Sequence, residues 1–152
     1  MEIATLPHVD EHTEIVTAEA RTVWRGLGEV LDRSFSEGRF AGYASLVGCP
    51  DRAAAGPRPM AEGSAYPGFH VASADPDREL VLVGRHYFST YALVFRLDQA
   101  GPGRIRLRAE TRARFPGPIG ALYRLLVIGT RGHAFSVRRL LAAVRRQAEH
   151  VR

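Results

Sequence analysis

His133 is the side chain best suited to act on a small molecule in this sequence. It is spaced one helical turn from Thr130 and lies between the apolar residues Leu126 and Val137. An imidazole in such a setting can orient a ligand carbonyl, or act as a general acid/base near neutral pH. The position equally suits a histidine that only satisfies its hydrogen bonds inside a core, so both interpretations stay open. Thr111 and Tyr91 are polar groups that could assist it.

Other kinds of reactive site lack their residues. The six histidines show no HExxH or similar metal-ligand spacing, and Cys49 is the only cysteine, so we expect neither a zinc site nor an internal disulfide. The sequence contains neither a glycine-rich phosphate loop nor the motif G-x-S-x-G. We therefore predict no metal and no cofactor.

Composition predicts one domain over residues 1–152. The chain is 45% hydrophobic and 24% charged, which is typical of a globular protein able to build its own core. No apolar run reaches the ~20 residues of a membrane span, and the first residues lack the layout of a signal peptide. We expect a cytoplasmic protein without stable membrane insertion.

The net charge of +5 is carried by arginine, because all 21 basic residues are Arg. Arginine in place of lysine, together with abundant Ala, Gly and Pro, is what codon bias in a GC-rich genome produces. The arginines are also spread along the chain rather than gathered in one tail. We therefore predict a solvated surface and no nucleic-acid partner.

The segment from Pro116 to Arg152 has the longest helical period in the chain. Its apolar positions recur every three or four residues along one face, which includes Ile119, Leu122, Leu126, Val137 and Leu141. Arginines gather on the opposite face. We predict one long C-terminal helix that lies against a sheet.

The preceding chain predicts the sheet and a first helix. The first 12 residues are expected to lead into a strand near residues 12–16, followed by a helix over 18–33 and a shorter helix near 39–47. Residues 49–68 are rich in Pro, Gly and Ala without a period, and predict a long loop that acts as a lid or is a tolerated insertion. Strands are predicted over residues 69–74, 79–84, 89–98 and 104–115.

The last of these strands has the clearest alternation in the sequence. Arg and Glu occupy the even positions from 104 to 114, while apolar or small residues occupy the odd positions. Ala109, Thr111 and Ala113 place three small side chains together on the inner face. They leave room for a cavity below the helix, or else let the helix pack closely on the sheet.

Residues 14–27, EIVTAEARTVWRGL, resemble the opening of START-like (SRPBCC, helix-grip) proteins, which include polyketide cyclase/dehydrase-like and pollen-allergen-like members. Val23, Trp24 and Leu27 form the Val-Trp-x-x-Leu-type pattern of the helix that follows the first strand in that superfamily. The closing half, a hairpin sheet followed by a helix rich in Leu and Arg, is similar as well. The chain departs from the pattern at Glu19, where a proline is frequent, and in the loop 49–68, so the sheet is expected to have fewer than the usual seven strands.

The resemblance implies an α+β helix-grip fold, in which an antiparallel sheet wraps around the C-terminal helix with an apolar cavity between them. Members of the superfamily bind lipids, polyketides or other apolar molecules there, and a minority do chemistry on them. We predict that an apolar or aromatic molecule is bound by residues Tyr91, Phe95, Ala109, Thr111, Ala113, Phe115, Tyr123, Leu126, Thr130, His133 and Val137.

Two alternatives remain at this point. In the first, the protein is a cyclase- or dehydratase-like enzyme with His133 as acid/base. In the second, it is an interaction protein without a pocket, which uses Ile128 and Phe135. These two apolar residues fall on the arginine side of the predicted helix, and they indicate a possible homodimer contact.

Overall fold

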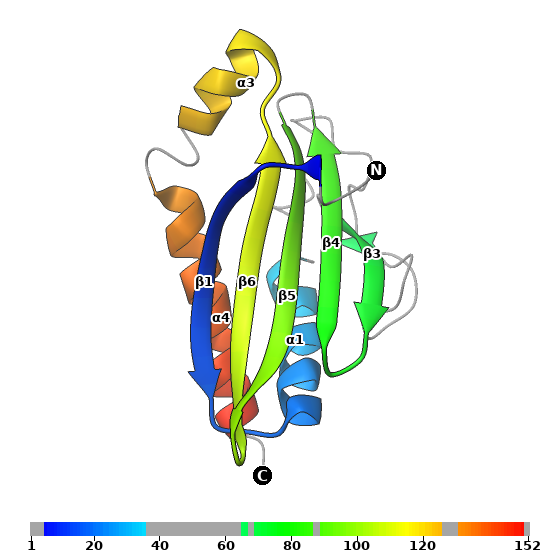
Figure 1. Cartoon of the computed structure of the whole chain (residues 1–152), viewed down its shortest axis with the longest axis vertical. Coiled ribbons are helices and arrows are strands. Elements are labelled where there is room, and N and C mark those ends of the chain that lie inside the picture. The colour runs from blue at the N-terminus through cyan, green and yellow to red at the C-terminus, as the bar shows by residue number, and fades with distance from the viewer. Residues whose placement is uncertain (1–4, 36–64, 67–68, 87–88, 126–130, 151–152) are drawn as a thin grey trace.

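The computed structural model describes residues 5–35, 65–66, 69–86, 89–125 and 131–150 (Figure 1). The elements in chain order are β1 (His8–Val16), α1 (Ala20–Phe35), β2 (Ala65–Tyr66), β3 (Phe69–Asp75), β4 (Glu79–His86), β5 (Ser89–Gly101), β6 (Arg104–Arg114), α3 (Gly117–Arg124) and α4 (Gly132–His150). Within this part of the chain, no helix is long and apolar enough to cross a membrane.

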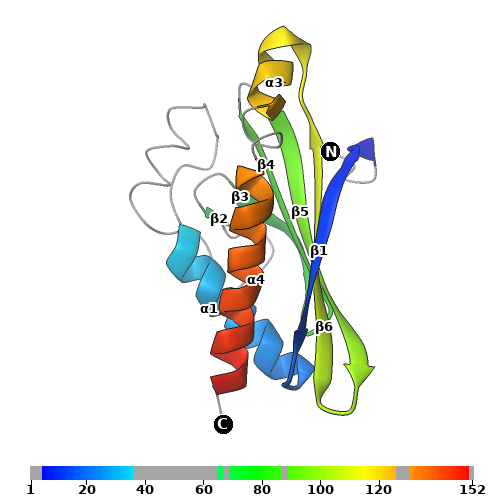
Figure 2. The same ribbon diagram turned by 90° about the vertical axis from the view of Figure 1, so that its left-hand side faces the viewer.

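The strands form one antiparallel sheet in the order β1-β6-β5-β4-β3-β2. Both α1 and α4 lie on the same face of this sheet, which curves around them (Figures 1 and 2). The predicted α+β helix-grip architecture is confirmed. Among the described residues the sheet has six strands.

The alternation predicted for residues 104–115 is also confirmed. In β6 the side chains of Ile105, Leu107 and Ala109 are buried, while those of Arg104 and Arg106 are exposed. A tight turn joins β5 to β6, where Gly101 and Gly103 have φ angles of +145° and +68° that favour glycine.

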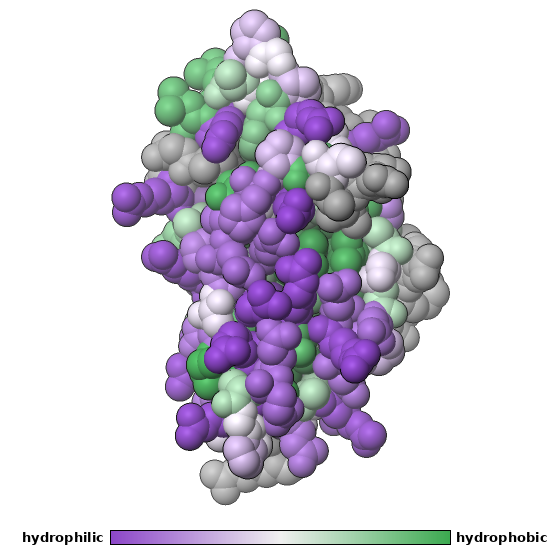
Figure 3. All heavy atoms as spheres, viewed as in Figure 1, coloured by the Kyte–Doolittle hydropathy of each residue, from purple (hydrophilic) through white to green (hydrophobic). Residues whose placement is uncertain are grey.

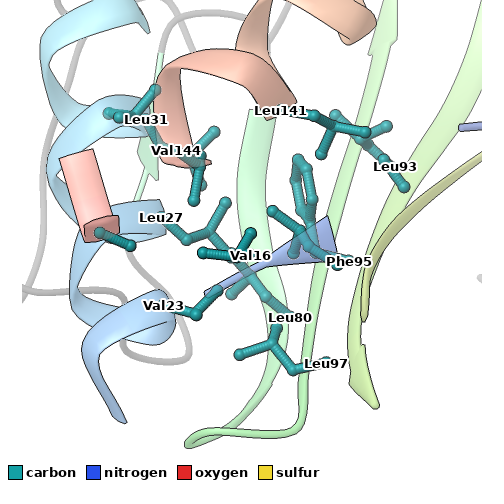
Figure 4. Close-up of a cluster of buried hydrophobic side chains, with 14 of the residues drawn as sticks. Val16, Val23, Leu27, Leu31, Leu80, Leu93, Phe95, Leu97, Leu141 and Val144 are labelled. Carbon is teal, nitrogen blue, oxygen red and sulfur yellow. The ribbon is translucent and has the colours of Figure 1, made fainter. Parts of the chain in front are cut away.

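The main core lies between the two helices and the inner face of the sheet (Figure 4). Its largest fully buried side chain is Phe95 of β5, which packs with leucines and valines of both helices. The helix α1 contributes Val23, Leu27 and Leu31 at the three- and four-residue spacing that its sequence predicts.

The N-terminal residues differ from the expected lead-in, because β1 already begins at His8. Residues from His8 onward pair with β6, starting at Arg112, and Asp10 stands opposite Thr111. The apolar alternation that marks a strand is missing from this half, since its inward positions are polar. The strand ends with buried Val16 facing the core.

The single long C-terminal helix predicted from Pro116 onward is wrong, since α3 and α4 are separate helices. Arg131, just before α4, has a φ angle of +62°, which a continuous helix does not allow. The sequence around it, Gly-Thr-Arg-Gly, contains two glycines, each of which weakens a helix by about 1 kcal/mol relative to alanine. Ile119 and Leu122, expected to face the sheet, are consequently exposed.

The predicted loop 49–68 contains β2, a two-residue strand paired with β3. The rest of that segment, and the helix predicted near 39–47, lie outside the described residues.

Candidate functional site

The residues predicted to bind a ligand fall into two groups in the structure. Phe95, Ala109 and Val137 are members of the packed core cluster. Thr111, Ala113, Tyr91, Phe115, Tyr123 and His133 lie at or beyond the end of that core nearest α3. Leu126 and Thr130 lie outside the described residues.

Thr111 and His133, both predicted to face the space between sheet and helix, are joined by a hydrogen bond. Thr111 points inward from β6 and is buried. The first turn of α4 brings His133 above it, and the Thr111 hydroxyl and His133 Nε2 lie 2.8 Å apart. Which of the two donates depends on the tautomer of the imidazole.

Asp10 and His12 of β1 complete this polar group, and the sequence analysis did not single them out. The register of β1 on β6 sets Asp10 opposite Thr111 and His12 opposite Ala109, so both point toward α4. Asp10 Oδ1 lies 3.6 Å from His133 Nε2, and Asp10 Oδ2 lies 3.2 Å from His12 Nε2. The signal available in the sequence was the spacing of two in Asp10-x-His12, which puts both side chains on one face of a strand.

The contacts of His12 show how its ring is oriented. Arg138 Nε lies 3.4 Å from His12 Nδ1, and a guanidinium can only donate, so Nδ1 accepts. The proton of a neutral His12 is then on Nε2, which donates to Asp10 Oδ2. Asp10 Oδ1 is buried and has no hydrogen-bond partner among the described residues, although it faces His133. This carboxylate oxygen can therefore accept a hydrogen bond from the His133 imidazole.

Burial lowers the pKa of His133 below the usual 6.5, because a charged imidazolium is poorly solvated there. The Asp10 carboxylate opposes this shift and His12 adds to it. His133 is therefore a neutral imidazole at neutral pH. In that form one ring nitrogen donates and the other accepts a proton, as acid/base chemistry or recognition of a carbonyl requires.

Four aromatic rings lie on the α3 side of this polar group. Tyr91 pairs with Ala113 across the strands and meets the ring of Phe69 edge-on, with 5.1 Å between the ring centroids. The rings of Phe115 and Tyr123 lie 6.4 Å apart where β6 passes into α3. All four rings are only half-buried. Since Ala113 is small, this end of the inner face combines flat apolar walls with one polar group.

A second charged cluster, on the outer face of the sheet, has a structural explanation. Burial opposes ionisation of Glu110, but hydrogen bonds from His8, Arg96 and Arg112 outweigh it and lower the pKa of the carboxyl to about 2. These partners lie 2.8 to 3.2 Å from the carboxylate. The cluster ties β1, β5 and β6 together on a face that is mainly hydrophilic (Figure 3).

The described residues include no group of three or more His, Cys, Asp or Glu side chains arranged to hold a metal ion.

No protein-family profile and no curated protein sequence matches the chain. Solved structures do match in fold. A protein from Chromobacterium violaceum is 11% identical, with coverage of 94% of this chain and 99% of that one and a TM-score of 0.60. A START superfamily protein from Mycobacterium smegmatis is 12% identical, with coverage of 95% and 99% and a TM-score of 0.56.

Norcoclaurine synthase from Thalictrum flavum is also similar in fold. Its truncated form is 10% identical, with coverage of 97% of this chain and 99% of that one and a TM-score of 0.58. Another structure of that enzyme is a complex with dopamine and hydroxybenzaldehyde. At these identities the likeness shows the fold alone, and that fold is START-like.

Proposed function

We propose that this chain is a cytoplasmic protein that binds an apolar or aromatic small molecule on the inner face of the sheet, at the end nearest α3. The observation that carries the proposal is the Thr111–His133 hydrogen bond beside Asp10, set among half-buried aromatic rings. Binding sites for small molecules combine mainly apolar walls with a few polar groups that fix the orientation of the ligand.

The inner face of the sheet is packed at one level and less filled nearer α3, which supports this position for the site. Phe95 and Ala109 pair across β5 and β6, and both are fully buried in the core, so that level is filled by protein. Two inward-facing pairs further toward α3, Ala113 pairs with Tyr91 and belongs to neither buried apolar cluster. The fold supports the ligand class in general terms, since a START-like enzyme with aromatic ligands, norcoclaurine synthase, is among the similar structures.

A matched pair of substitutions tests the proposal. Ala113→Leu adds the same atoms as Ala109→Leu, two pairs further along β6. We expect Ala113→Leu to reduce binding of an apolar fluorescent probe at least ten-fold while the melting temperature changes little. Ala109→Leu should instead destabilise the protein by about 1–3 kcal/mol, because it overfills a packed core.

Native mass spectrometry of freshly purified protein provides the second measurement, with an apolar adduct as the expected result. A clean mass of the chain alone, together with no uptake of the probe, would sink the proposal. Equal effects of the two alanine substitutions on the probe would place the site elsewhere.

Catalysis is a second candidate function, favoured by the lowered pKa of His133 and by the Asp10 oxygen that faces it. Here His133 acts as general acid/base on the bound molecule, with Thr111 or Tyr91 assisting. A mass change of the co-purified ligand that His133→Leu abolishes, while ligand affinity is retained, would indicate catalysis. Because Asp10 raises the pKa of His133, Asp10→Asn should shift the pH profile of such a reaction toward lower pH.

A homodimer through Phe135 is the remaining candidate. Phe135 is exposed on α4, with the guanidinium of Arg139 over its ring, whereas Ile128 lies outside the described residues. If the dimer forms, sedimentation velocity should show association that depends on concentration and is lost in Phe135→Glu. A monomer at all concentrations would exclude it.

A further inference from the structure

The helix α3 exposes apolar side chains where a surface helix normally exposes polar ones. Ile119, Leu122 and Leu125 are 65%, 57% and 64% exposed. The residue of α3 that is buried is Gly120, which has no side chain to contribute. The helix projects at one end of the molecule (Figures 1 and 2), and apolar atoms gather there in the surface view (Figure 3). Exposed apolar patches of this kind mark contacts with other molecules.

The charge of the surrounding sequence is entirely of one sign. Between Glu110 and Glu149 there is no acidic residue, and there are eight arginines. Four exposed arginines stand before, within and after α3, namely Arg114, Arg124, Arg131 and Arg139. None of these four forms an ion pair with an acidic residue of the described chain, whereas Arg96, Arg108 and Arg145 elsewhere all do.

We propose that α3 docks on the surface of an anionic lipid bilayer. Ile119, Leu122 and Leu125 would enter the boundary between headgroups and acyl chains, while the flanking arginines contact the anionic headgroups. Apolar residues on one side and cationic residues around them are what binding at a membrane interface requires. This is a reversible surface contact without a spanning segment. It goes beyond the proposed ligand binding and does not depend on it.

The charge pattern favours an anionic bilayer over a second copy of the chain or a nucleic acid as the partner of α3. A second copy of the chain would place arginines against arginines across a two-fold contact, with no acidic residue in this segment to offset the repulsion. A nucleic acid would accept the arginines but would leave three large apolar side chains against its phosphates, which gains nothing from their burial. An anionic bilayer buries the apolar side chains and also pairs the arginines with negative headgroups.

Vesicle co-sedimentation tests the proposal on the full chain. The protein should sediment with vesicles of phosphatidylcholine and phosphatidylglycerol at low salt, and much less with phosphatidylcholine alone or at high salt. The double variant Leu122→Glu/Leu125→Glu should reduce the bound fraction at least ten-fold. Ile15→Glu is the matched control, since Ile15 is also exposed, at the other end of the sheet, and should bind as the wild type does.

The arginines are tested in the same way. Arg124→Gln and Arg131→Gln should each weaken binding to anionic vesicles roughly five-fold, the effect expected of one basic residue near a charged membrane. Arg104→Gln, in the turn at the far end of β6, should have no such effect. All the substituted side chains are exposed, so melting temperatures should stay close to that of the wild type.

Three results would overturn the proposal. These are no sedimentation with anionic vesicles at low salt, equal binding by the Leu122→Glu/Leu125→Glu variant, or self-association that this variant abolishes in the absence of lipid. Probe binding to the inner face is measured separately without vesicles. Failure of the membrane contact can thus be told apart from failure of the proposed ligand site.

Discussion

At the scale of single residues, His133 makes the free energy of unfolding depend on pH. Its pKa is lowered in the folded state, first by burial, with His12 adding and Asp10 opposing. The unfolded chain therefore takes up a proton near pH 6.5, before the folded chain does. The stability linked to His133 is complete above pH 6.5 and is lost as the pH falls from there through the folded pKa.

Substituting His133 with glutamine should remove this contribution. Glutamine keeps a polar group that can bond Thr111 but does not titrate in this range. We expect the free energy of unfolding, measured with urea at several pH values between 7.5 and 5, to fall less steeply for His133→Gln than for the wild type. The variant His12→Gln is the control, since it shows how much removal of the neighbouring imidazole alone changes the pH dependence. Parallel curves for His133→Gln and the wild type would show that His133 does not titrate differently on folding.

At the scale of secondary-structure elements, the helices α1 and α4 pack closely against each other at Gly26. A Cβ atom at Gly26 would lie 3.6 Å from Ala148 Cβ and 3.6 Å from the carbonyl oxygen of Val144, which are ordinary contact distances. Gly26 therefore leaves room for one methyl group between the helices and no more. It also costs helix stability, because glycine has a large conformational entropy in the unfolded chain.

Gly26→Ala should accordingly stabilise the protein, by up to about 1 kcal/mol. Gly26→Leu should instead destabilise it by about 1–3 kcal/mol, since a larger side chain must push α1 and α4 apart. Chemical denaturation of the two variants gives both values. A loss of stability in Gly26→Ala would mean that the helices cannot accommodate even ordinary contact at this position.

The sequence predicted those elements whose faces differ strongly in polarity. In β6 every second residue is charged, so the residues of its inner face could be derived from the pattern, whereas its register with β5 is known only from the structure. The pattern misled over Pro116–Arg152, because an apolar period continues across the break between α3 and α4. Periodicity reports which residues would share a face of a helix, and it does not report whether the backbone stays helical at Arg131.

The candidate site shows the same limit. Thr111 and His133 could be placed together, because an inward residue of a strand and an inward residue of the helix above it were both evident. Asp10 and His12 were missed, since the inner face of β1 is polar in that half and polar alternation resembles a loop. Only the pairing of β1 with β6 brings these side chains to His133.

At the scale of the whole molecule, the packed core and the proposed ligand site lie toward opposite ends of the sheet. The core around Phe95, Leu107 and Leu141 is fully buried and holds both helices to the sheet. Toward α3 the inner face carries half-buried rings and the polar group, and α3 itself adds an apolar exposed surface. In the proposed function, this arrangement lets one end accommodate the ligand while the other end keeps the fold intact.

Ligand binding should therefore protect one end of the molecule. With an apolar fluorescent probe at 100 times its Kd, the folded state should gain about 2.7 kcal/mol, seen as a higher melting temperature. Amide hydrogen exchange should slow at Thr111–Arg114 of β6 and in α3. The amides of the Gly101–Arg104 turn exchange through local opening at the far end of the same hairpin, so they should stay unchanged. Ala113→Leu is the control, and in that variant the probe should protect neither region. Equal protection of both ends, or protection of the turn alone, would contradict a ligand site between β6 and α4.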